Sequence, residues 1–477
     1  MVRISLSVVI LLTATAYAQV TASGSGTGST PTVGVSTPAP NAPEPQGNAS
    51  TPQAPTVPPA GAGAAAPQTP IPATPGTSPA APTLITLDEA VTLALANSPT
   101  LAAMRTTVPQ SQAQEITAGL RPNPVLSWDA LFIPIFSPGN FSESFANNVQ
   151  QFDIGVGYLI ERGHKRQARL QAARDATAVT KSQLYDFERT LTFNVAQQFV
   201  NALLAKSNFE FAQQDLASFQ ETVNISQERY KAGDISEGDL LKIKIQLLQF
   251  QTDVAAARIA RTQALGSLRQ LIGYHSVPSN YDVAGELVFQ PLTAGREDLQ
   301  ARALRERPDL LAAQQSVTAA GSQVALAKAN GKQDLDTAFT FSHVSGASSG
   351  SVSFSIPLAI FNRNQGEIAR TRFALTQAQQ TEKAAEETVV TDVSNAYEAT
   401  KTNQQIVELY QSGYLNQAQQ SRDISDYAYK RGAATLLDLL DAERSYRSTQ
   451  LAYRQALATY MLSLEQLREA VGSRTLP

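Results

Sequence analysis

The sequence contains no cysteine, so we expect neither disulfide bonds nor a cysteine-linked lipid anchor; an anchor of another kind stays open. Beyond the N-terminus, no apolar stretch approaches the ~20 residues of a membrane-spanning helix. Charged residues make up only 16% of the chain, with a formal net charge of -4, and no basic patch indicates a nucleic-acid partner. The composition therefore argues against a disulfide-stapled module, a helical membrane protein and a nucleic-acid-binding protein.

Catalytic and metal-binding patterns are also lacking. His164, His275 and His343 are scattered singly, without the clustering that metal ligation requires. No nucleophile with a base, phosphate loop or pair of catalytic acids stands out in the sequence. We therefore expect no enzymatic activity, no cofactor and no bound metal site.

The first 83 residues predict targeting and linker segments. A basic start, the apolar run Ile4–Thr13 and the small residues Ala16 and Ala18 fit a secretory signal peptide over 1–18. A membrane anchor is the alternative, but the run is too short to span a bilayer of ~30 Å. Residues 19–83 are rich in Pro, Ala, Thr, Ser and Gly, with Glu44 their only charge, and this composition predicts a disordered tether. The folded part is expected over 84–477.

The folded part contains an internal repeat. Tyr230–Gly273 aligns without a gap with Tyr429–Gly472, at an offset of about 199 positions. Gly233 and Asp239 of the first copy correspond to Gly432 and Asp438 of the second. We therefore divide the folded part into repeats 84–290 and 291–477, each built around one long hairpin.

Each repeat begins with short helices. Thr86 is a plausible N-cap with Glu89 at the third helical position, and Pro99 interrupts the first helix after Asn97. The predicted helices run to about Asn97 and then over Thr100–Leu120, with counterparts at Asp298–Arg307 and Asp309–Asn330.

The hydrophobic period then changes from 3.6 to 2, which predicts two strand hairpins. The strands are expected in Val125–Phe132, Gln151–Tyr158, the Phe339–Ser342 region and Ser351–Ile356, joined by polar loops at Ser137–Asn148 and Gly346–Gly350. Apolar and polar residues alternate along them, as in a membrane β-barrel with a wet lumen, and an ordinary soluble sheet is the alternative. The residues expected to face lipid are Leu126, Trp128, Phe152, Ile154, Phe339, Phe341 and Phe354.

Very long helices follow the strands. His164–Lys231 and Asn364–Arg431 lack proline, and each would reach ~100 Å if unbroken. Each run reverses at a glycine, Gly233 or Gly432, into a returning helix. The spacing of apolar residues by three and four predicts a coiled-coil seam in the first returning helix, made by Leu240, Ile243, Leu247, Phe250, Val254 and Ala257. Four strands cannot close a barrel, since the smallest membrane barrels need about eight. The fold class is therefore mostly α with a small β part, in an oligomeric conduit.

The segments LDEAVTLALANSPTL, SFSIPLAIFNRNQGEIAR, YKAGDISEGDLL and YKRGAATLLDLLDA resemble the TolC-like outer-membrane efflux proteins, over essentially Leu84–Gly472. The resemblance implies a homotrimer whose transmembrane β-barrel, completed by trimerisation, continues into a coiled-coil α-barrel in the periplasm. It also implies a membrane fusion (adaptor) protein at the glycine turns and an inner-membrane pump of the proton-driven resistance-nodulation-division type. Gly163–Arg166 and the segment NRNQG look most like the subgroup that exports heavy-metal cations.

Candidate site residues lie near the glycine turns. Asp438 and Asp441 project from one helix face, and the resemblance places them as rings of carboxylates at the periplasmic aperture. The alternative is an N-terminal charge that complements the helix dipole. By the same resemblance, Asp239 and Tyr429 take part in closed-state contacts. Some relatives carry arginine where this chain has Ala434, so the latch is looser or uses residues such as Lys430, Arg431 or Lys242.

The two turns are also the expected docking tip for the adaptor. The tip residues are Gly233, Asp234, Ile235 and Ser236 in the first repeat and Gly432, Ala433, Ala434 and Thr435 in the second. The sequence thus predicts an outer-membrane channel of a tripartite efflux system, with metal cations as candidate substrates. Drug efflux, type I protein secretion and a non-transporting periplasmic coiled-coil adaptor are the alternatives.

Overall fold

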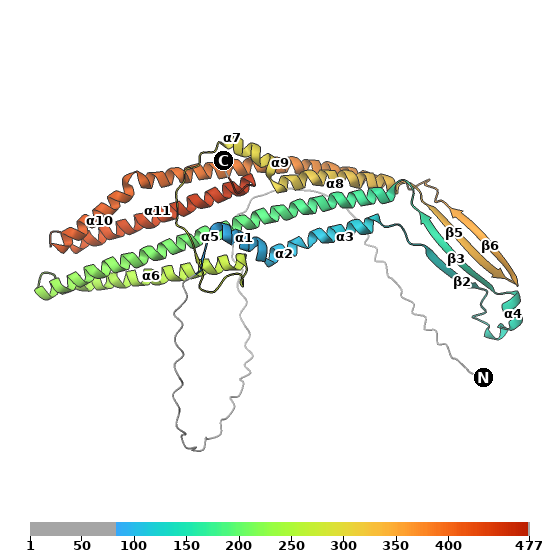
Figure 1. The fold of residues 1–477 in the computed structure, drawn as a ribbon, viewed down its shortest axis with the longest axis horizontal. Coiled ribbons are helices and arrows are strands. Elements are labelled where there is room, and N and C mark those ends of the chain that lie inside the picture. Colours follow the sequence, from blue (N-terminus) through green and yellow to red (C-terminus); the bar gives the residue numbers. More distant parts are fainter. Residues whose placement is uncertain (1–82, 476–477) are drawn as a thin grey trace, which may run out of the picture. The chain divides into compact units, whose positions relative to one another are not determined.

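A computed structural model describes residues 83–475 of the chain, except for the side chains of 146–148. The expected signal peptide and almost all of the expected tether lie outside the described residues. Figure 1 shows the long helices side by side, with the β-sheet at one end and the helical turns at the other. Among the described helices, none is long and apolar enough to cross a membrane.

Short helices precede the strands in both repeats, as predicted. The sequence predicted one helix over Thr100–Leu120. This is wrong, because the helix is interrupted at Thr106. Pro109 has no N–H for the carbonyl of Arg105 and its ring crowds that carbonyl, so a new helix starts at Thr107. The short helices are α1 (Leu87–Asn97), α2 (Pro99–Arg105), α3 (Thr107–Gly119), α7 (Arg296–Glu306) and α8 (Pro308–Asn330).

The predicted N-cap of α1 is confirmed as a full capping box. The Thr86 hydroxyl accepts a hydrogen bond from the backbone N–H of Glu89, at 3.3 Å. The Glu89 carboxylate in turn accepts from the backbone N–H of Thr86, at 2.8 Å. Two otherwise unpaired backbone donors of the first turn are thus satisfied.

The four predicted strands form one antiparallel sheet in the order β2-β3-β5-β6. The alternation is confirmed by the register, in which Trp128 lies opposite Ile154 and Ile154 lies opposite Phe341. The central pairing, β3 with β5, joins the two repeats. The strands are β2 (Val125–Leu131), β3 (Gln151–Ile160), β5 (Leu335–Val344) and β6 (Ala347–Ser355).

Both predicted strand connections differ in the structure. Ser137–Asn148 is not a plain loop, since it contains the 3₁₀ turn η1 (Pro138–Asn140) and the helix α4 (Glu143–Asn148). The second loop is shorter than predicted, because β6 already begins at Ala347. Ser345 and Gly346 both have positive φ, 50° and 75°, and this left-handed pair makes a tight two-residue hairpin possible.

The first long hairpin is formed as predicted. One unbroken helix, α5 (Lys165–Ala232), turns at Gly233 and returns as α6 (Glu237–Ile272). Four of the six predicted seam residues of α6 are buried, and Phe250 stacks on Phe219 of α5 with ring centroids 4.4 Å apart. The seam residues are Leu240, Ile243, Leu247, Phe250, Val254 and Ala257, of which Leu247 and Ala257 are half-buried.

The second long hairpin is interrupted where the sequence predicted a single helix. A π-helical turn, η2 (Tyr410–Tyr414), separates α9 (Gln365–Leu409) from α10 (Leu415–Lys430). Gly413 adopts φ 141° in this turn, which a residue with a side chain rarely reaches. After Gly432 the chain returns as α11 (Leu436–Val471).

A core lies midway along the helices, where α1 packs against α5 and α6. A two-stranded parallel pair, β1 (Leu84–Ile85) with β4 (Asp282–Val283), closes it and was not predicted. Ile85, Leu101, Val195 and Leu268 are among its buried side chains. Through this core, the first residues of the described chain pack against the first hairpin.

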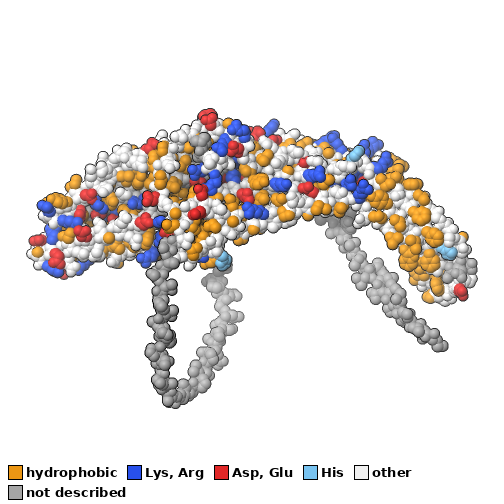
Figure 2. All heavy atoms as spheres, in the orientation of Figure 1, with side chains coloured by type: hydrophobic (Ala, Val, Ile, Leu, Met, Phe, Trp, Pro, Cys, Tyr) orange, Lys and Arg blue, Asp and Glu red, His pale blue; other side chains and the backbone are white. Residues whose placement is uncertain are grey.

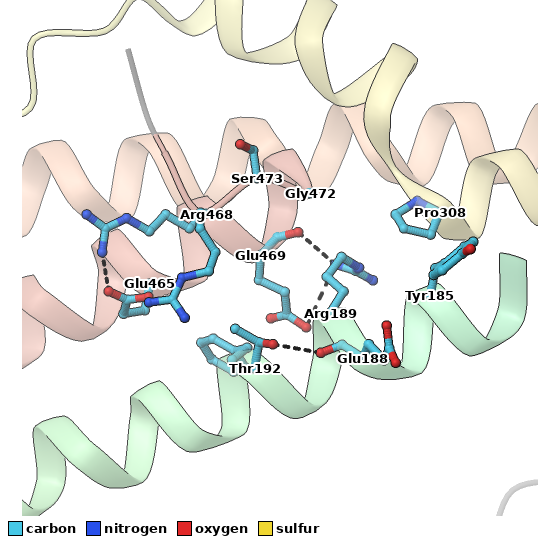
Figure 3. Close-up of a pocket in the computed structure, with 12 residues that line it drawn as sticks. Tyr185, Glu188, Arg189, Thr192, Pro308, Glu465, Arg468, Glu469, Gly472 and Ser473 are labelled. Atoms are coloured by element: carbon cyan, nitrogen blue, oxygen red, sulfur yellow. Dashed lines mark hydrogen bonds and ion pairs between the residues drawn. The ribbon is translucent and has the colours of Figure 1, made fainter. Parts of the chain in front are cut away.

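At the same level, Arg189 attaches the end of α11 to α5, and Arg307 at the α7–α8 corner donates a hydrogen bond to the Ala470 carbonyl of α11 at 3.2 Å. The Arg189 guanidinium donates to the backbone oxygen of Glu469 at 2.7 Å and lies 3.8 Å from its carboxylate, beside a cleft of about 210 Å³ (Figure 3). Burial is the main cause that raises the pKa of Glu469. Arg307 is buried and pairs with Asp309 at 2.6 Å and Asp392 at 3.0 Å. The Arg189 contacts join the two repeats, whereas the ion pairs of Arg307 lie within the second repeat.

Candidate functional site

The two helical turns at the end opposite the sheet lie in the region where the sequence predicts the aperture. Gly233 and Gly432 have positive φ, 84° and 75°, so the reversal at a left-handed glycine is confirmed in both repeats. The backbone N–H of Gly432 donates to the carbonyl of Tyr429 at 3.0 Å, and that of Gly233 donates to the carbonyl of Tyr230 at 3.0 Å. The two turns are therefore built alike.

A cleft of about 580 Å³ lies between the two turns. It brings together Asp239 and Tyr429 with tip residues of both repeats, whereas Asp438 and Asp441 lie outside its lining. The lining residues are Arg229, Asp234, Ile235, Ser236, Asp239, Lys242, Tyr429, Ala434, Thr435, Leu436, Leu437 and Leu440.

Asp438 has a defined position in the first turn of α11. It forms a capping box with Thr435, whose hydroxyl donates to its Oδ2 at 2.7 Å and whose backbone N–H donates to the same oxygen at 3.0 Å. These hydrogen bonds hold the pKa of the Asp438 carboxyl below its ordinary value. Asp438 and Asp441 are both exposed in the single chain, and their spacing places them about one helical turn apart.

Asp239 occupies the equivalent position in the first repeat. The Ser236 hydroxyl donates to its carboxylate at 2.9 Å, and Lys242 lies 3.3 Å away. Both contacts lower the pKa of Asp239. Asp239 therefore remains ionised at neutral pH, beside a lysine where the second repeat has Asp441.

Tyr429 joins the two hairpins within one chain. It is buried, its hydroxyl lies 3.2 Å from the Ser226 hydroxyl, and its backbone oxygen accepts from the Arg229 guanidinium at 2.6 Å. Arg229 also lies over the Tyr429 ring, 5.2 Å from its centroid. Sequence reasoning missed Arg229, because its partner is about 200 positions away and no local pattern marks it.

The three cations proposed for the latch have local partners within the chain. Lys430 pairs with Asp426 at 2.9 Å, Lys242 pairs with Asp239, and Arg431 lies over the Tyr427 ring at 4.7 Å. None of these contacts crosses between the hairpins. Their role between neighbouring copies stays a prediction.

The residues predicted to face lipid share one face of the sheet, and no core covers that face within the described chain. Figure 2 shows hydrophobic side chains gathered over the sheet. The exposed fractions are 73% for Leu126, 67% for Trp128, 38% for Phe152, 51% for Ile154, 56% for Phe339, 45% for Phe341 and 69% for Phe354. Ser127, Gly155, Thr340 and Ser351 follow one another across the opposite, polar face.

Among the described residues, no group of three or more His, Cys, Asp or Glu side chains has an arrangement that could hold a metal ion. The carboxylates at the turns therefore offer fixed negative charge, whose effect on a nearby ion is electrostatic.

Comparison with known families gives an extended match. A model described as outer membrane efflux protein matches residues 90–274 and 299–473. The chain is 22% identical over 377 residues to the cobalt-zinc-cadmium resistance protein CzcC of Cupriavidus metallidurans, covering 77% of this chain and 85% of that protein. It is 25% identical over 410 residues to the pyoverdine export outer membrane protein OpmQ of Pseudomonas aeruginosa, covering 81% and 83%.

Solved structures show the same fold. A crystal structure of CusC has a TM-score of 0.67 at 19% identity and covers 85% of this chain and 99% of that chain. The open state of the Neisseria gonorrhoeae MtrE outer membrane channel has a TM-score of 0.67 at 20% identity and covers 81% and 89%. The mostly helical architecture with a small sheet is thus the fold of outer-membrane channels.

The contribution of the Thr435 hydroxyl to the first turn of α11 can be tested by substitution. Replacing Thr435 with Ala removes the hydroxyl that accepts from the Asp438 N–H, and we expect the first turn of α11 to lose about 1 kcal/mol. Hydrogen exchange at the amides of Asp438 and Leu439 should become roughly fivefold faster. Thr449→Ala is the matched control, since its hydroxyl donates only within α11, to the Ser445 carbonyl. Equal exchange in both variants would contradict the capping role.

Proposed function

The chain belongs to the outer membrane efflux protein family, and from this we propose that three copies form a channel that carries the substrates of an inner-membrane pump across the outer membrane. Members of the family are outer-membrane channels that extend into the periplasm, and they are not enzymes. They work with adaptor proteins and inner-membrane pumps in tripartite efflux.

The observation that carries the proposal is the open sheet. Among the described residues, its edge strands β2 and β6 each have one side without a partner strand, and its apolar face is exposed. Unpaired edges bind further strands, and an exposed apolar face needs lipid or protein to cover it. When β2 of one copy pairs with β6 of the next, three copies close twelve strands into a barrel with lipid outside and the polar row of Ser127 and Thr340 inside.

The helical hairpins of the three copies extend the proposed barrel into the periplasm. In a trimer, the exposed carboxylates of Asp438 and Asp441 form two rings at the narrow end. These rings attract cations, and their mutual repulsion favours opening. The capping bonds of Asp438 fit this role, since they keep its carboxylate ionised.

The two tip turns are proposed as the docking surface for a periplasmic adaptor. The cleft between them offers the small residue Ala434 and the exposed Leu437 to a partner hairpin. The adaptor joins the channel to a pump, proposed to be of the proton-driven resistance-nodulation-division type.

Metal cations are the proposed substrates. CzcC is named for cobalt, zinc and cadmium resistance, and CusC of Escherichia coli, 27% identical over 285 residues, is named as a cation efflux system protein. OpmQ, which is named for pyoverdine export, supports an organic siderophore as the second candidate.

Assembly is tested on the full chain in its native membrane. We expect it in the outer-membrane fraction, extracted only by detergent, as a trimer that survives moderate heating in detergent. A freely soluble monomer would instead support the non-transporting adaptor. Cross-linking with a short amine-reactive reagent, followed by mass measurement, separates the two outcomes.

The substrate is tested by deleting the gene that encodes this protein. Deletion should lower tolerance to zinc, cobalt or cadmium and raise the cell-associated metal, and a plasmid copy should restore both. Unchanged metal tolerance together with impaired siderophore secretion would overturn the cation assignment in favour of the second candidate.

The aperture is tested with a charge-only change. Asp438→Asn with Asp441→Asn removes the proposed rings, while asparagine remains a good N-terminal helix residue. In planar bilayers, the cation-to-anion permeability ratio should fall severalfold. Glu386→Gln, at an exposed position of α9 outside the two turns, is the matched control and should leave the ratio unchanged. An unaltered ratio in the double variant would remove the two residues from the conduction path.

A further inference from the structure

A cleft with a basic lining lies where the first two strands of the sheet meet the long helices. Its volume is about 390 Å³, and it is formed by the end of β3, the start of α5 and the segment between α3 and β2. Arg121, Lys165 and Arg166 are among its lining residues. Between β3 and α5 the chain passes through Gly163 and His164, whose positive φ values, 69° and 61°, mark a sharp change of direction. Figure 2 shows Lys and Arg side chains gathered near this junction of sheet and helices.

The carboxylates at the cleft are already paired with cations. Glu161, which lines it, lies 2.7 Å from the Arg169 guanidinium, and Asp334 lies 2.7 Å from the Lys165 ammonium. The Asp334 carboxylate also accepts a hydrogen bond from the backbone N–H of Arg162 at 3.0 Å. Both ion pairs are neutral, so neither carboxylate is left for the remaining arginines of the lining.

Two guanidinium groups, those of Arg121 and Arg166, therefore remain without a counter-ion. No hydrogen bond or ion pair joins either of them to another described residue. Arg121 is exposed and Arg166 is half-buried. Two positive charges on one cleft repel each other, and a bound anion relieves this repulsion. A phosphate group suits this pair, because the planar guanidinium donates parallel hydrogen bonds to phosphate oxygens.

The cleft lies at the edge of the apolar face of the sheet. Tyr158 and Ile160 line it, and the two-residue period of β3 places them on the same face as Ile154. The 10 residues of β3, at ~3.4 Å each and a tilt of ~40°, span about 25 Å, which is the height of the apolar band of a membrane barrel. After β6 the apolar alternation continues to Ile356 and Leu358, which are 46% and 79% exposed. In the proposed barrel the cleft is therefore level with the phospholipid headgroups of the periplasmic leaflet.

We propose that this cleft, which we name the basic junction cleft, binds the phosphate group of an anionic phospholipid of the periplasmic leaflet. Arg121 and Arg166 donate to the phosphate oxygens, and Ile160 contacts the first part of an acyl chain. Three copies of the chain give three such sites around the base of the barrel. This inference rests on the proposed function, because it places the sheet in the outer membrane.

Two features favour a lipid over other occupants of the cleft. A free anion uses the cations alone, whereas Tyr158 and Ile160, which is 42% exposed, give the cleft an aromatic and apolar rim that suits an amphiphile. The next copy of the chain does not neutralise the cleft. In the proposed trimer its segment after β6, Ile356–Arg363, lies beside β2 and the cleft, and this segment contains no Asp or Glu. The two positive charges are thus left for the membrane surface.

The test places a fluorescent reporter beside the cleft in the full-length trimer, reconstituted in vesicles. The chain has a single tryptophan, Trp128 in the middle of β2, so Ile160→Trp in a Trp128→Phe background gives one reporter at the cleft. Its quenching by brominated phosphatidylglycerol and by brominated phosphatidylcholine with the same acyl chains measures the relative affinity of the cleft for the two lipids. We expect a preference of roughly tenfold for phosphatidylglycerol, because each arginine near the membrane surface attracts anionic lipid. In the wild-type chain, quenching of Trp128 should show no preference.

Removing the two charges should remove the preference. Arg121→Gln with Arg166→Gln should bring the affinities for the two lipids close to equal, whereas Arg121→Lys with Arg166→Lys keeps the charge and should retain most of the preference. Arg305→Gln with Arg444→Gln, at exposed positions of α7 and α11, is the matched control and should leave the preference unchanged. Equal affinities without the arginine substitutions, or a preference that survives the glutamine pair, would overturn the proposal.

Two further measurements separate the remaining outcomes. Inorganic phosphate, added at constant ionic strength, should leave the lipid preference unchanged, and loss of the preference would refute the lipid in favour of the free ion. Trimers that conduct ions but show no lipid preference would refute the cleft alone. A soluble monomer would refute the channel. If that monomer still bound phosphatidylglycerol vesicles in preference to phosphatidylcholine vesicles through the two arginines, the cleft would stand, and equal binding would refute both.

Discussion

The open edges of the four-stranded sheet set the condition that the rest of the chain must meet. Within the described residues, β2 and β6 each present unpaired backbone groups, and nothing covers the apolar face that includes Trp128 and Phe354. In the proposed trimer, closing the sheet between copies gives these backbone groups the partners that they need in a membrane. The pairing of β3 with β5 joins the two repeats, so each copy of the proposed trimer contributes both repeats to the barrel. The proposal also requires the helices of neighbouring copies to lie parallel and in register.

The two copies of the internal repeat share the design of their turns but differ in the helix that leads to the turn. Both hairpins use a left-handed glycine, a hydroxyl N-cap and an aspartate at the third helical position. Among the described residues, the second hairpin has a π-helical turn that includes Gly413, whereas the first approaches its turn as the single helix α5. π-helical turns occur frequently at functional sites. The glycine of this π-helical turn is therefore a local feature that distinguishes the second repeat from the first.

Local patterns predicted most of the fold, because helices, strands and caps depend on neighbouring residues. The Thr86 cap, the glycine reversals and the alternation of Trp128 with Asp129 are all of this kind. The break at Thr106 also has a local cause, in Pro109, which sequence reasoning passed over. The π-helical turn, the β1–β4 pair and the contact of Arg229 with Tyr429 depend on packing between distant segments. Spacing along the chain contains little information about such contacts. The sequence therefore predicted which segments form the candidate site but not which side chains contact one another there.

The sequence presented a helix-dipole charge and an aperture ring as alternatives for Asp438, and the capping contacts of this residue are compatible with both. Both capping bonds from Thr435 end on Oδ2, and they favour the ionised carboxylate, so the residue that starts α11 also keeps its charge in mild acid. Glu443, further along the same helix, has the opposite tendency, because burial favours its neutral form near pH 7. Near pH 7, protonation along α11 therefore changes the charge of the buried Glu443 and leaves the carboxylate of Asp438 ionised.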